Sequence, residues 1–558
     1  LMRIISGSDY KLEDELGVVK AMISRMGEDG MVYNLPYRED TPWRYKENTG
    51  CRGTEARMDE EVSSITVNAM LSIALMQRYQ RDNDPYMLEV AGKLINALVN
   101  IAIYKDDYAY YPATFGQRFE FSYYSKTGWP DTKEAEHELA SAEGAVTCYI
   151  SMIIRALSRY YSITKDNKVL DLAGRLTKYI LKPQFWLGNI ERWSSEGSGF
   201  NDVWTGHGGA QRKPAALYKA HTAGVAYTLE GLIDYALVAQ DDYVKDFVRQ
   251  GYEFMRNLGL AKIGMWGENI AHGYAAGIAI KLSDAGAGDY WEDVDQYIRN
   301  CMVEDQLNDV GILKEFCRER NVPAEISEFI TERMVGGLVH NGNLDRNGTL
   351  DPTSNMAEIT CPYQEPFYYV WEGITRYKDG MAQINLLLNR VSSWLDLESH
   401  LPYEGKVVIR NKTARHIAVR IPKWVDKSMI NSLINGKKTV FYTVGNYIQF
   451  LDVNNEDVIN IEFPMKESVE SCVLIGMGAD AKQWYKRQEE FPQYTMRFKG
   501  NTCVEVNIVN KEKFPADHPN FGARGTIRYP IYQREHMLKN KAPVKKVTRF
   551  VSKNLAEW

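Results

Sequence analysis

The sequence predicts a mainly α protein with a β portion: an (α/α)6 toroid of six helical hairpins, followed by an antiparallel β-sandwich. Two observations predict it. Long apolar helix patterns in the first 300 residues are separated by recurring Asp/Asn-rich turns, and such recurrence marks a repeat architecture. These turns are Asp82–Pro85, Lys165–Asn167, Gln240–Asp242 and Asp284–Asp289. Near residue 379 the helical period gives way to the alternation of strands.

Helical periodicity predicts about a dozen helices, as six hairpins require. A representative stripe is Val225, Leu229, Leu232 and Ile233. The predicted helices are 11–27, 59–80, 86–103, 138–161, 167–181, 213–239, 243–257, 272–283, 290–303, 310–320, 323–335 and 362–376. Long loops rich in Tyr, Trp, His, Gly and Asn remain at 104–136, 183–212 and 336–361. Loops of that length in a compact domain are usually functional, and in a toroid they would gather at one rim.

Strand patterns predict the sandwich. They lie at 406–410, 416–422, 447–451 and 458–463, with turns at Asn435-Gly436 and Gly445-Asn446. We therefore predict a catalytic toroid at 1–378, a sandwich at 379–480, and a C-terminal β-rich extension at 481–558 that packs on the sandwich or the toroid.

Composition narrows the function classes. The 558 residues carry a net charge of −6, which gives no electrostatic case for binding nucleic acid. No apolar run is long enough to span a membrane. The seven cysteines form no CxxC pair, which argues against a disulfide framework and a zinc ribbon. The 35 Tyr and 12 Trp suit a carbohydrate cleft, because their rings combine a flat apolar face with a polar group.

The sequence leaves open whether the chain forms oligomers. It also leaves open the location, which is periplasmic or secreted if a signal peptide was removed and cytoplasmic otherwise.

Several blocks between residues 215 and 470 resemble a known family. They are Leu401–Val407, Val419–Trp424, Ile434–Gly436, Ile459–Met465, Thr360–Pro362 with Tyr369 and Asp379-Gly380, and Gly267-Glu268 with His272–Ala275. Together they resemble glycoside hydrolase family 127, the β-L-arabinofuranosidase-like group. The resemblance implies a toroid followed by a sandwich, a glutamate general acid at Glu268, and a carbohydrate substrate.

The resemblance also implies a zinc ion held by three cysteines and a glutamate, with a cysteine thiolate as nucleophile. Here the first residue of the family's cysteine pair is Thr360, and the Glu-x-Cys pair corresponds to His272 and Tyr274. Only Cys361 remains as a metal ligand or nucleophile. A thiolate-rich tetrahedral zinc site needs about four ligands, so the ligand set is incomplete.

The predicted catalytic residues are Glu268, Glu358 and Cys361. Glu268 follows Trp266, and a carboxyl desolvated beside Trp acquires a raised pKa suited to a general acid. Its structural alternative is a carboxylate at a helix N-terminus. Glu358 is the best second carboxylate, as nucleophile or base. Cys361 is either a lone nucleophile or a buried structural cysteine.

The remaining candidates would bind the sugar. They are Glu143, Trp204, His207, His221, Trp266, His272, Tyr274 and His340. His207 lies in a Gly-rich loop that is not a phosphate loop, since no GK[ST] follows. Glu143 lies among small residues, so it could face the bore of the toroid.

Three functions compete. The first is a glycoside hydrolase that removes a terminal sugar from a branched polysaccharide or glycoconjugate. The second is a polysaccharide lyase acting on a uronate-containing glycan, with Tyr274, His272 and Arg212 in the elimination. The third is a non-catalytic carbohydrate-binding relative.

Overall fold

The computed structural model describes the chain in two compact units. The described residues are 1–34, 61–112, 123–129, 131–135, 146–186, 222–256, 261–264, 269–303, 364–473, 493–509 and 532–544, with single positions between 306 and 325 and after 549. One unit holds Ser8–Met255 with residues 477–480 and 554–558, and the other holds Leu1–Gly7, Arg256–Gly476 and Ala481–Lys553. Among the helices described, none has the length and apolar character that crossing a membrane requires.

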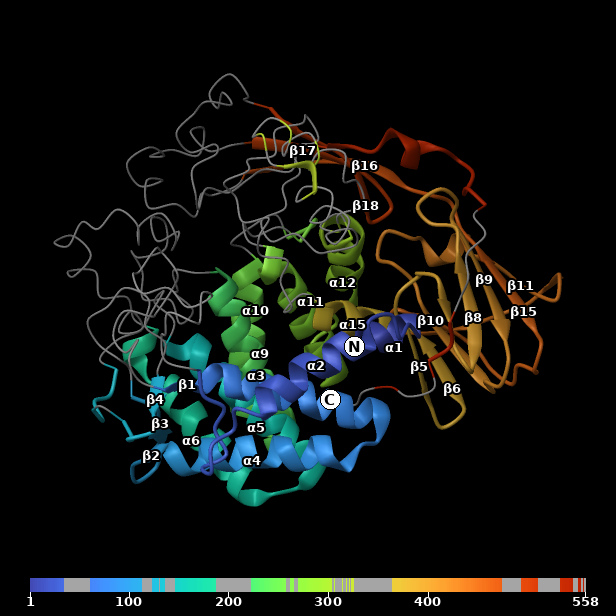
Figure 1. Ribbon diagram of the computed structural model, residues 1–558. Helices are drawn as coiled ribbons and strands as arrows, with labels where there is room; N and C mark the ends of the chain where they lie inside the picture. The colour runs from blue at the N-terminus through green and yellow to red at the C-terminus, as the bar shows by residue number, and fades with distance from the viewer. Residues whose placement is uncertain are drawn as a thin grey trace. The chain divides into compact units, whose positions relative to one another are not determined.

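The Ser8–Met255 unit is built from α-helices in consecutive pairs (Figure 1). They are α2 (Leu12–Ile23), α3 (Ile65–Asp82), α4 (Pro85–Ile101), α5 (Val146–Thr164), α6 (Asn167–Ile180), α9 (Thr222–Ala239) and α10 (Asp242–Arg256). A 3-10 turn η3 (Pro183–Phe185) and short strands accompany them: β1 (Val62–Ser64), β2 (Ile103–Tyr104), β3 (Ala109–Tyr110) and β4 (Tyr123–Ser125). Helix α5 packs against α3, α6 and α9.

The Asp/Asn turns act as predicted, ending one helix and capping the next. Asn83 closes α3 in the left-handed conformation at φ 54°, and the Asp84 carboxylate accepts a hydrogen bond from the backbone N–H of Tyr86 at the start of α4. Lys165, at φ 59°, and Asp166 repeat this arrangement before α6. Each hairpin therefore turns within a few residues.

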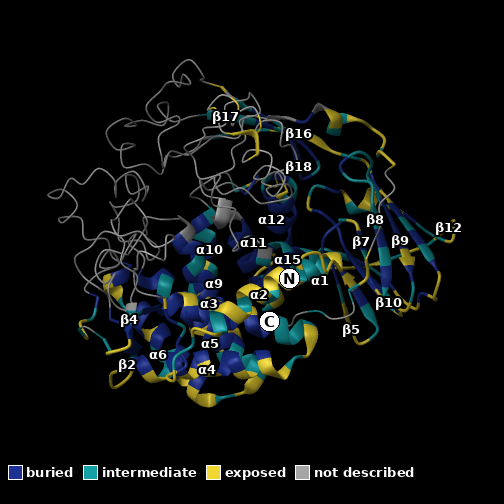
Figure 2. Cartoon of the chain, viewed as in Figure 1, coloured by how far each residue is buried: buried dark blue, intermediate teal, exposed yellow. Residues whose placement is uncertain are grey.

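Small residues let α5 and α9 approach closely. A Cβ placed on Gly231 would lie 2.2 Å from the carbonyl oxygen of Ser151. The Ser151 hydroxyl donates to the carbonyl of Tyr227 at 3.0 Å, across the same contact. Next to it, the buried Arg155 pairs with Glu230 at 3.3 Å and with Asp234 at 3.4 Å. Both ion pairs join α5 to α9, and all three side chains are buried. Figure 2 shows buried residues in dark blue on these two helices.

The other unit begins with helices and continues as sheets. Its helical elements are α1 (Met2–Ser6), α11 (Asn269–Asp284), α12 (Trp291–Tyr297), the π-helical turn η4 (Ile298–Met302) and α15 (Gln364–Ile374). Helix α11 packs against both α12 and α15. The fourth Asp-rich turn joins α11 to α12, and there the Ser283 hydroxyl accepts a hydrogen bond from the backbone N–H of Tyr290 at 2.9 Å.

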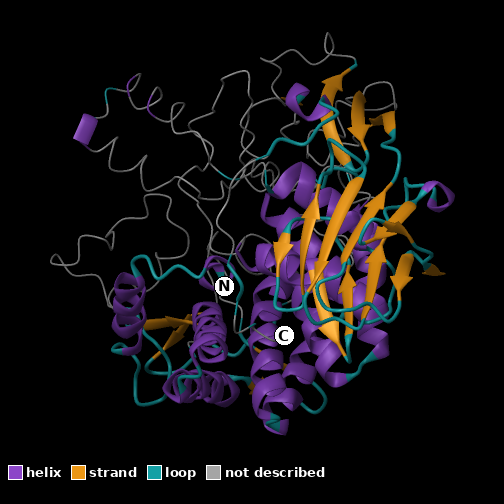
Figure 3. Cartoon of the chain, turned by 90° about the vertical axis from the view of Figure 1, so that its right-hand side faces the viewer, coloured by secondary structure: helices purple, strands orange, loops and turns teal. Residues whose placement is uncertain are grey.

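Two sheets follow α15 (Figure 3). The five-stranded sheet runs β13 (Tyr442–Val444), β14 (Tyr447–Phe450), β10 (His416–Arg420), β6 (Met381–Ile384), β5 (Thr375–Lys378). The six-stranded sheet runs β12 (Lys437–Lys438), β11 (Asn431–Ile434), β15 (Val458–Glu462), β9 (Lys406–Asn411), β8 (Leu395–Ser399), β7 (Arg390–Val391). A 3-10 turn η6 (Lys427–Met429) precedes β11. In β15, Ile459 and Ile461 are buried and alternate with more exposed residues, as a sheet with one face on a core requires. In β10, Ile417 to Arg420 are all buried.

The pairing departs from the expected antiparallel pattern at one point. Strand β10 pairs antiparallel with β14 but parallel with β6, whereas the other strand pairs described in these two sheets are antiparallel. The parallel pair is possible because β7, β8 and β9, which belong to the other sheet, separate β6 from β10 in sequence.

A third sheet contains β16 (Glu467–Val473), β17 (Gln493–Lys499), β18 (Thr502–Ile508) and β19 (Tyr532–Gln533), with the 3-10 turn η9 (Glu535–Leu538) after it. It is bound to η4 by buried polar groups. The Asn300 side chain accepts from the backbone N–H of Cys503 at 2.8 Å and donates to the carbonyl of Asn501 at 2.9 Å. Arg534, 1% exposed, donates to the carbonyl of Asn300 at 3.1 Å.

Most predicted elements are present, with shifted ends. The helix expected at 59–80 starts only at Ile65, because residues 62–64 form β1, paired with β4. The helix expected from 272 already starts at Asn269. The helices expected at 310–320 and 323–335 fall largely outside the described residues, and the predicted domain limits stay predictions.

Candidate functional site

Nearly all predicted site residues lie outside the part of the chain that the structure describes. They are Glu143, Trp204, His207, His221, Trp266, Glu268, His340, Glu358 and Cys361. Their roles remain predictions.

The remaining two, His272 and Tyr274, belong to the first turns of α11. The Tyr274 side chain is 2% exposed, so it is buried in the helical layer. Its role in substrate binding stays a prediction.

Helices α11 and α15 run in the same direction. The Lys281 ammonium lies 4.8 Å from the ring centre of Tyr369. Further along both segments, Asp284 forms an ion pair with Arg376, just beyond α15. Because the contacts advance along both helices together, the N-terminal ends of α11 and α15 point to the same side of the unit. In the sequence, Glu268 immediately precedes α11, and Cys361 stands three residues before α15.

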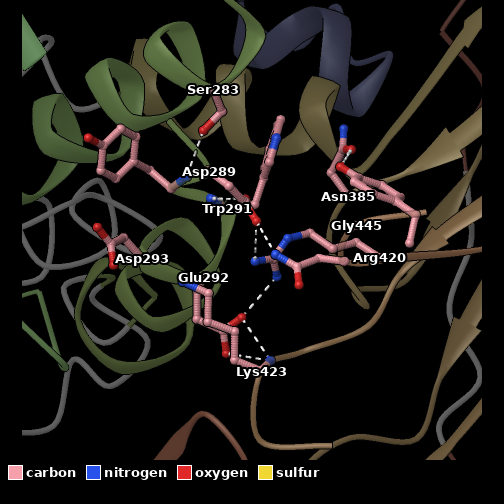
Figure 4. Close-up of polar contacts among 12 residues, drawn as sticks. Ser283, Asp289, Trp291, Glu292, Asp293, Asn385, Arg420, Lys423 and Gly445 are labelled. Carbon is pink, nitrogen blue, oxygen red and sulfur yellow. Dashed lines mark hydrogen bonds and ion pairs between the residues drawn. The ribbon is translucent and has the colours of Figure 1, made fainter. Parts of the chain in front are cut away.

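A buried charge network joins α12 to the five-stranded sheet (Figure 4). Arg420 of β10, 2% exposed, donates to Glu292 at 2.9 Å and to Asp289 at 3.2 Å. Asn501 also donates to Glu292, at 2.8 Å. The backbone N–H of Lys423 donates a third hydrogen bond to Glu292, at 3.2 Å. Arg420 and the carboxylates of Glu292 and Asp289 compensate one another's charge, while the buried Arg420 Nε has no hydrogen-bond partner among the described residues.

The network changes the acidity of Asp289. Partial burial raises the pKa of its carboxyl, but Arg420 and Asn446 outweigh burial and leave the pKa below its ordinary value. The ionised form is thus the stable one in the folded state.

Asp289 of this network also lines a pocket of about 670 Å³. The α11–α12 turn, the β5–β6 hairpin and β14 line it. The lining residues are Ser283, Asp284, Gly288, Asp289, Trp291, Arg376, Tyr377, Lys378, Asp379, Met381, Gln383 and Tyr447. Sequence reasoning did not find this pocket, since its residues come from three separated segments. The only signal was the Asp-rich turn at 284–289.

Aromatic residues of the 104–136 loop serve packing wherever they are described. Tyr108 stacks on Tyr179 with ring centres 5.8 Å apart, and Lys182 lies 3.3 Å from the Tyr108 ring centre. Tyr110 is 2% exposed. The hydrogen bond from Tyr108 to Glu134 raises the pKa of that phenol to about 12. These rings therefore hold the ends of the helices together.

The donor set does not fit a thiolate-rich zinc site. No three His, Cys, Asp or Glu side chains among the described residues gather as metal ligands. In the sequence, Cys361 has a threonine where the resembled family has a second cysteine. Such a site needs several thiolates, and Cys361 supplies one.

No protein-family model and no curated protein sequence matches the chain. Solved structures do match. The family 127 β-L-arabinofuranosidase of Geobacillus stearothermophilus T6 has a TM-score of 0.50 at 12% identity, covering 88% of this chain and 72% of that chain. A structure named only as a glycoside hydrolase has a TM-score of 0.50 at 11% identity, covering 89% and 74%. The chain shares their fold. A family 127 β-arabinofuranosidase follows with a TM-score of 0.49 at 12% identity, covering 89% and 72%.

The resemblance inferred from the sequence is thereby confirmed for the fold. The fold class is confirmed with it: helical hairpins of the (α/α)6 type followed by an antiparallel β-sandwich. A shared fold at this identity leaves the chemistry to be argued from the site.

Proposed function

We propose that this protein is a glycoside hydrolase that removes a terminal sugar, of the β-L-arabinofuranosidase-like kind, from a branched polysaccharide or glycoconjugate. The observation that carries the proposal is the fold shared with the family 127 β-L-arabinofuranosidase over 88% of this chain. The sequence blocks that resemble the same family point independently to the same class.

The parallel packing of α11 and α15 supports the proposed roles. Glu268 is covalently joined to the first residue of α11, and Cys361 and Glu358 stand three and six residues before α15. Three residues span at most about 10 Å and six at most about 20 Å. Two helices that run the same way and touch therefore allow these groups to meet at one end of the pair.

In this mechanism Glu268 protonates the leaving glycosidic oxygen. Glu358 attacks the anomeric carbon as nucleophile or activates a water as base, with Cys361 as the alternative nucleophile. His221, His272 and His340 and the aromatics Trp204 and Trp266 hold the sugar. A neutral Glu268 carboxyl is needed at the start of each turnover, so activity should fall as this group ionises with rising pH.

A panel of aryl glycosides tests the class, with α- and β-arabinofuranosides, hexopyranosides and uronides. Release of the aryl group with a free sugar as product supports hydrolysis. Unsaturated products that absorb in the ultraviolet, formed from a uronate polymer, would instead establish the lyase. Glycan binding without any turnover would establish the non-catalytic relative.

A further inference from the structure

The pocket between the α11–α12 turn and the β5–β6 hairpin is lined by three carboxylates, Asp284, Asp289 and Asp379, and by two cations, Arg376 and Lys378. Arg376 pairs with Asp284 and, at 2.8 Å, with Glu372. Asp289 pairs with Arg420 at 3.2 Å. The carboxylates compensate both arginines, and the excess of one carboxylate over the cations in the lining gives an anion no electrostatic advantage.

The groups that remain available are polar and lie side by side at the hairpin. Lys378 and Asp379 carry opposite charges, are exposed, and make no ion pair within the described ranges. Gln383 donates its amide N–H to Asn385 at 2.7 Å and to the Tyr447 hydroxyl at 3.1 Å. Those bonds orient the Gln383 side chain and leave its carbonyl oxygen as an acceptor.

The same hairpin presents a fixed aromatic ring. Tyr377 stacks on Trp394 with ring centres 5.4 Å apart and planes 7° apart, yet it remains 36% exposed. Because Trp394 already fixes one face of the Tyr377 ring, the side chain loses little conformational entropy when a ligand stacks on the other face. Sugar rings offer apolar C–H faces to such a ring and hydroxyls to neighbouring polar groups.

We propose that this pocket is an accessory binding site for a neutral carbohydrate chain, with Tyr377 as the stacking surface and Gln383, Lys378 and Asp379 as partners of the hydroxyls. The choice of a carbohydrate over another neutral polar ligand rests on the proposed function. Its volume of about 670 Å³ is within the range of small-molecule sites and holds a few sugar units. Such a site would keep a polymer bound while its ends are processed.

The test measures binding of neutral oligosaccharides by calorimetry. The probes are arabino-, xylo-, manno- and gluco-oligosaccharides of about five units, with an oligogalacturonide as the charged comparison. The protein carries Glu268→Gln to prevent turnover. Tyr377→Ala and Gln383→Ala are compared with Tyr442→Ala, whose ring is 60% exposed on β13 but does not line the pocket.

At least one neutral probe is expected to bind, with Tyr377→Ala weakening it about ten-fold, as loss of one aromatic contact implies. Gln383→Ala should weaken the same probe, and Tyr442→Ala should not. In the otherwise unmodified protein, Tyr377→Ala should leave cleavage of small aryl glycosides unchanged.

The outcomes separate the two proposals. No binding by any neutral probe, or binding that Tyr377→Ala and Gln383→Ala leave intact, overturns the accessory site even if aryl glycosides are cleaved. Preference for the oligogalacturonide also overturns it. Binding lost in both variants of a chain that cleaves no glycoside supports the accessory site and removes the hydrolase.

Discussion

Arg420 of strand β10 donates a hydrogen bond to Glu292 of helix α12 over 2.9 Å, with both side chains at most 10% exposed. The Glu292 carboxylate also accepts a hydrogen bond from the side-chain amide of Asn501, in the turn between β17 and β18. The Glu292 carboxylate thus links its own helix, α12, to the five-stranded sheet and to the third sheet. Its two partners, Arg420 and Asn501, are 128 and 209 positions away from Glu292 in the sequence.

Replacing Arg420 by Ala should lower the free energy of unfolding by about 3–5 kcal/mol, because Glu292 would be left as a buried and poorly compensated charge. Urea unfolding monitored by tryptophan fluorescence measures the loss. Arg497→Ala is the matched control, since its pair with Glu467 is 39% and 45% exposed and should contribute at most about 1 kcal/mol. Equal losses in the two variants would contradict the structural role of the network.

The lowered pKa of Asp289 predicts acid sensitivity. An Asp whose folded-state pKa lies below its unfolded value of about 3.9 adds stability above that value, and the gain is lost as the pH falls through the folded pKa. Unfolding free energy measured from pH 6 to about 3 should therefore fall less steeply in Asp289→Asn than in the unmodified chain. Identical slopes would show that the ion pair with Arg420 does not form in solution.

Gly231 should tolerate no side chain. Its substitution by Ala places a methyl group 2.2 Å from the Ser151 carbonyl oxygen, so α5 and α9 must separate. We expect a loss of about 1–3 kcal/mol, as for overpacked cores. Gly17→Ala, in α2 with nothing within 4 Å of the added carbon, should be neutral or stabilising. Comparable melting temperatures for both variants would argue against the close helix contact.

Burial raises the pKa of the Cys472 thiol to about 11. Only about a thousandth of it is thiolate at pH 8, so iodoacetamide should label it far more slowly than an ordinary thiol. Peptide mass spectrometry measures the rate, with urea-unfolded protein as the fast reference. Labelling at the reference rate would mean that Cys472 is accessible.

The same labelling experiment tests the choice of nucleophile. Rapid labelling of Cys361 below pH 7 would favour Cys361 over Glu358 as the nucleophile.

Local signals predicted the local structure well. Asp84 and Asp166 cap helices because their side chains have partners two residues away, and such partners are visible in a sequence. The β6–β10 parallel pair was not predictable, because three strands of the other sheet separate them. Nor was the polar pocket, whose walls come from Asp289, Tyr377 and Tyr447. Long-range pairing depends on tertiary packing, which periodicity does not record.

The most direct test of the proposed hydrolase is turnover by Glu268→Gln on the best substrate from the glycoside panel. Glutamine keeps the shape of the side chain but cannot donate a carboxyl proton, and loss of one general acid costs about 100- to 10,000-fold in rate. Glu89→Gln, on the exposed surface of α4, is the control for a lost charge. We expect kcat to fall by at least about 100-fold in Glu268→Gln alone, with an unchanged melting temperature. Full activity in Glu268→Gln would contradict it.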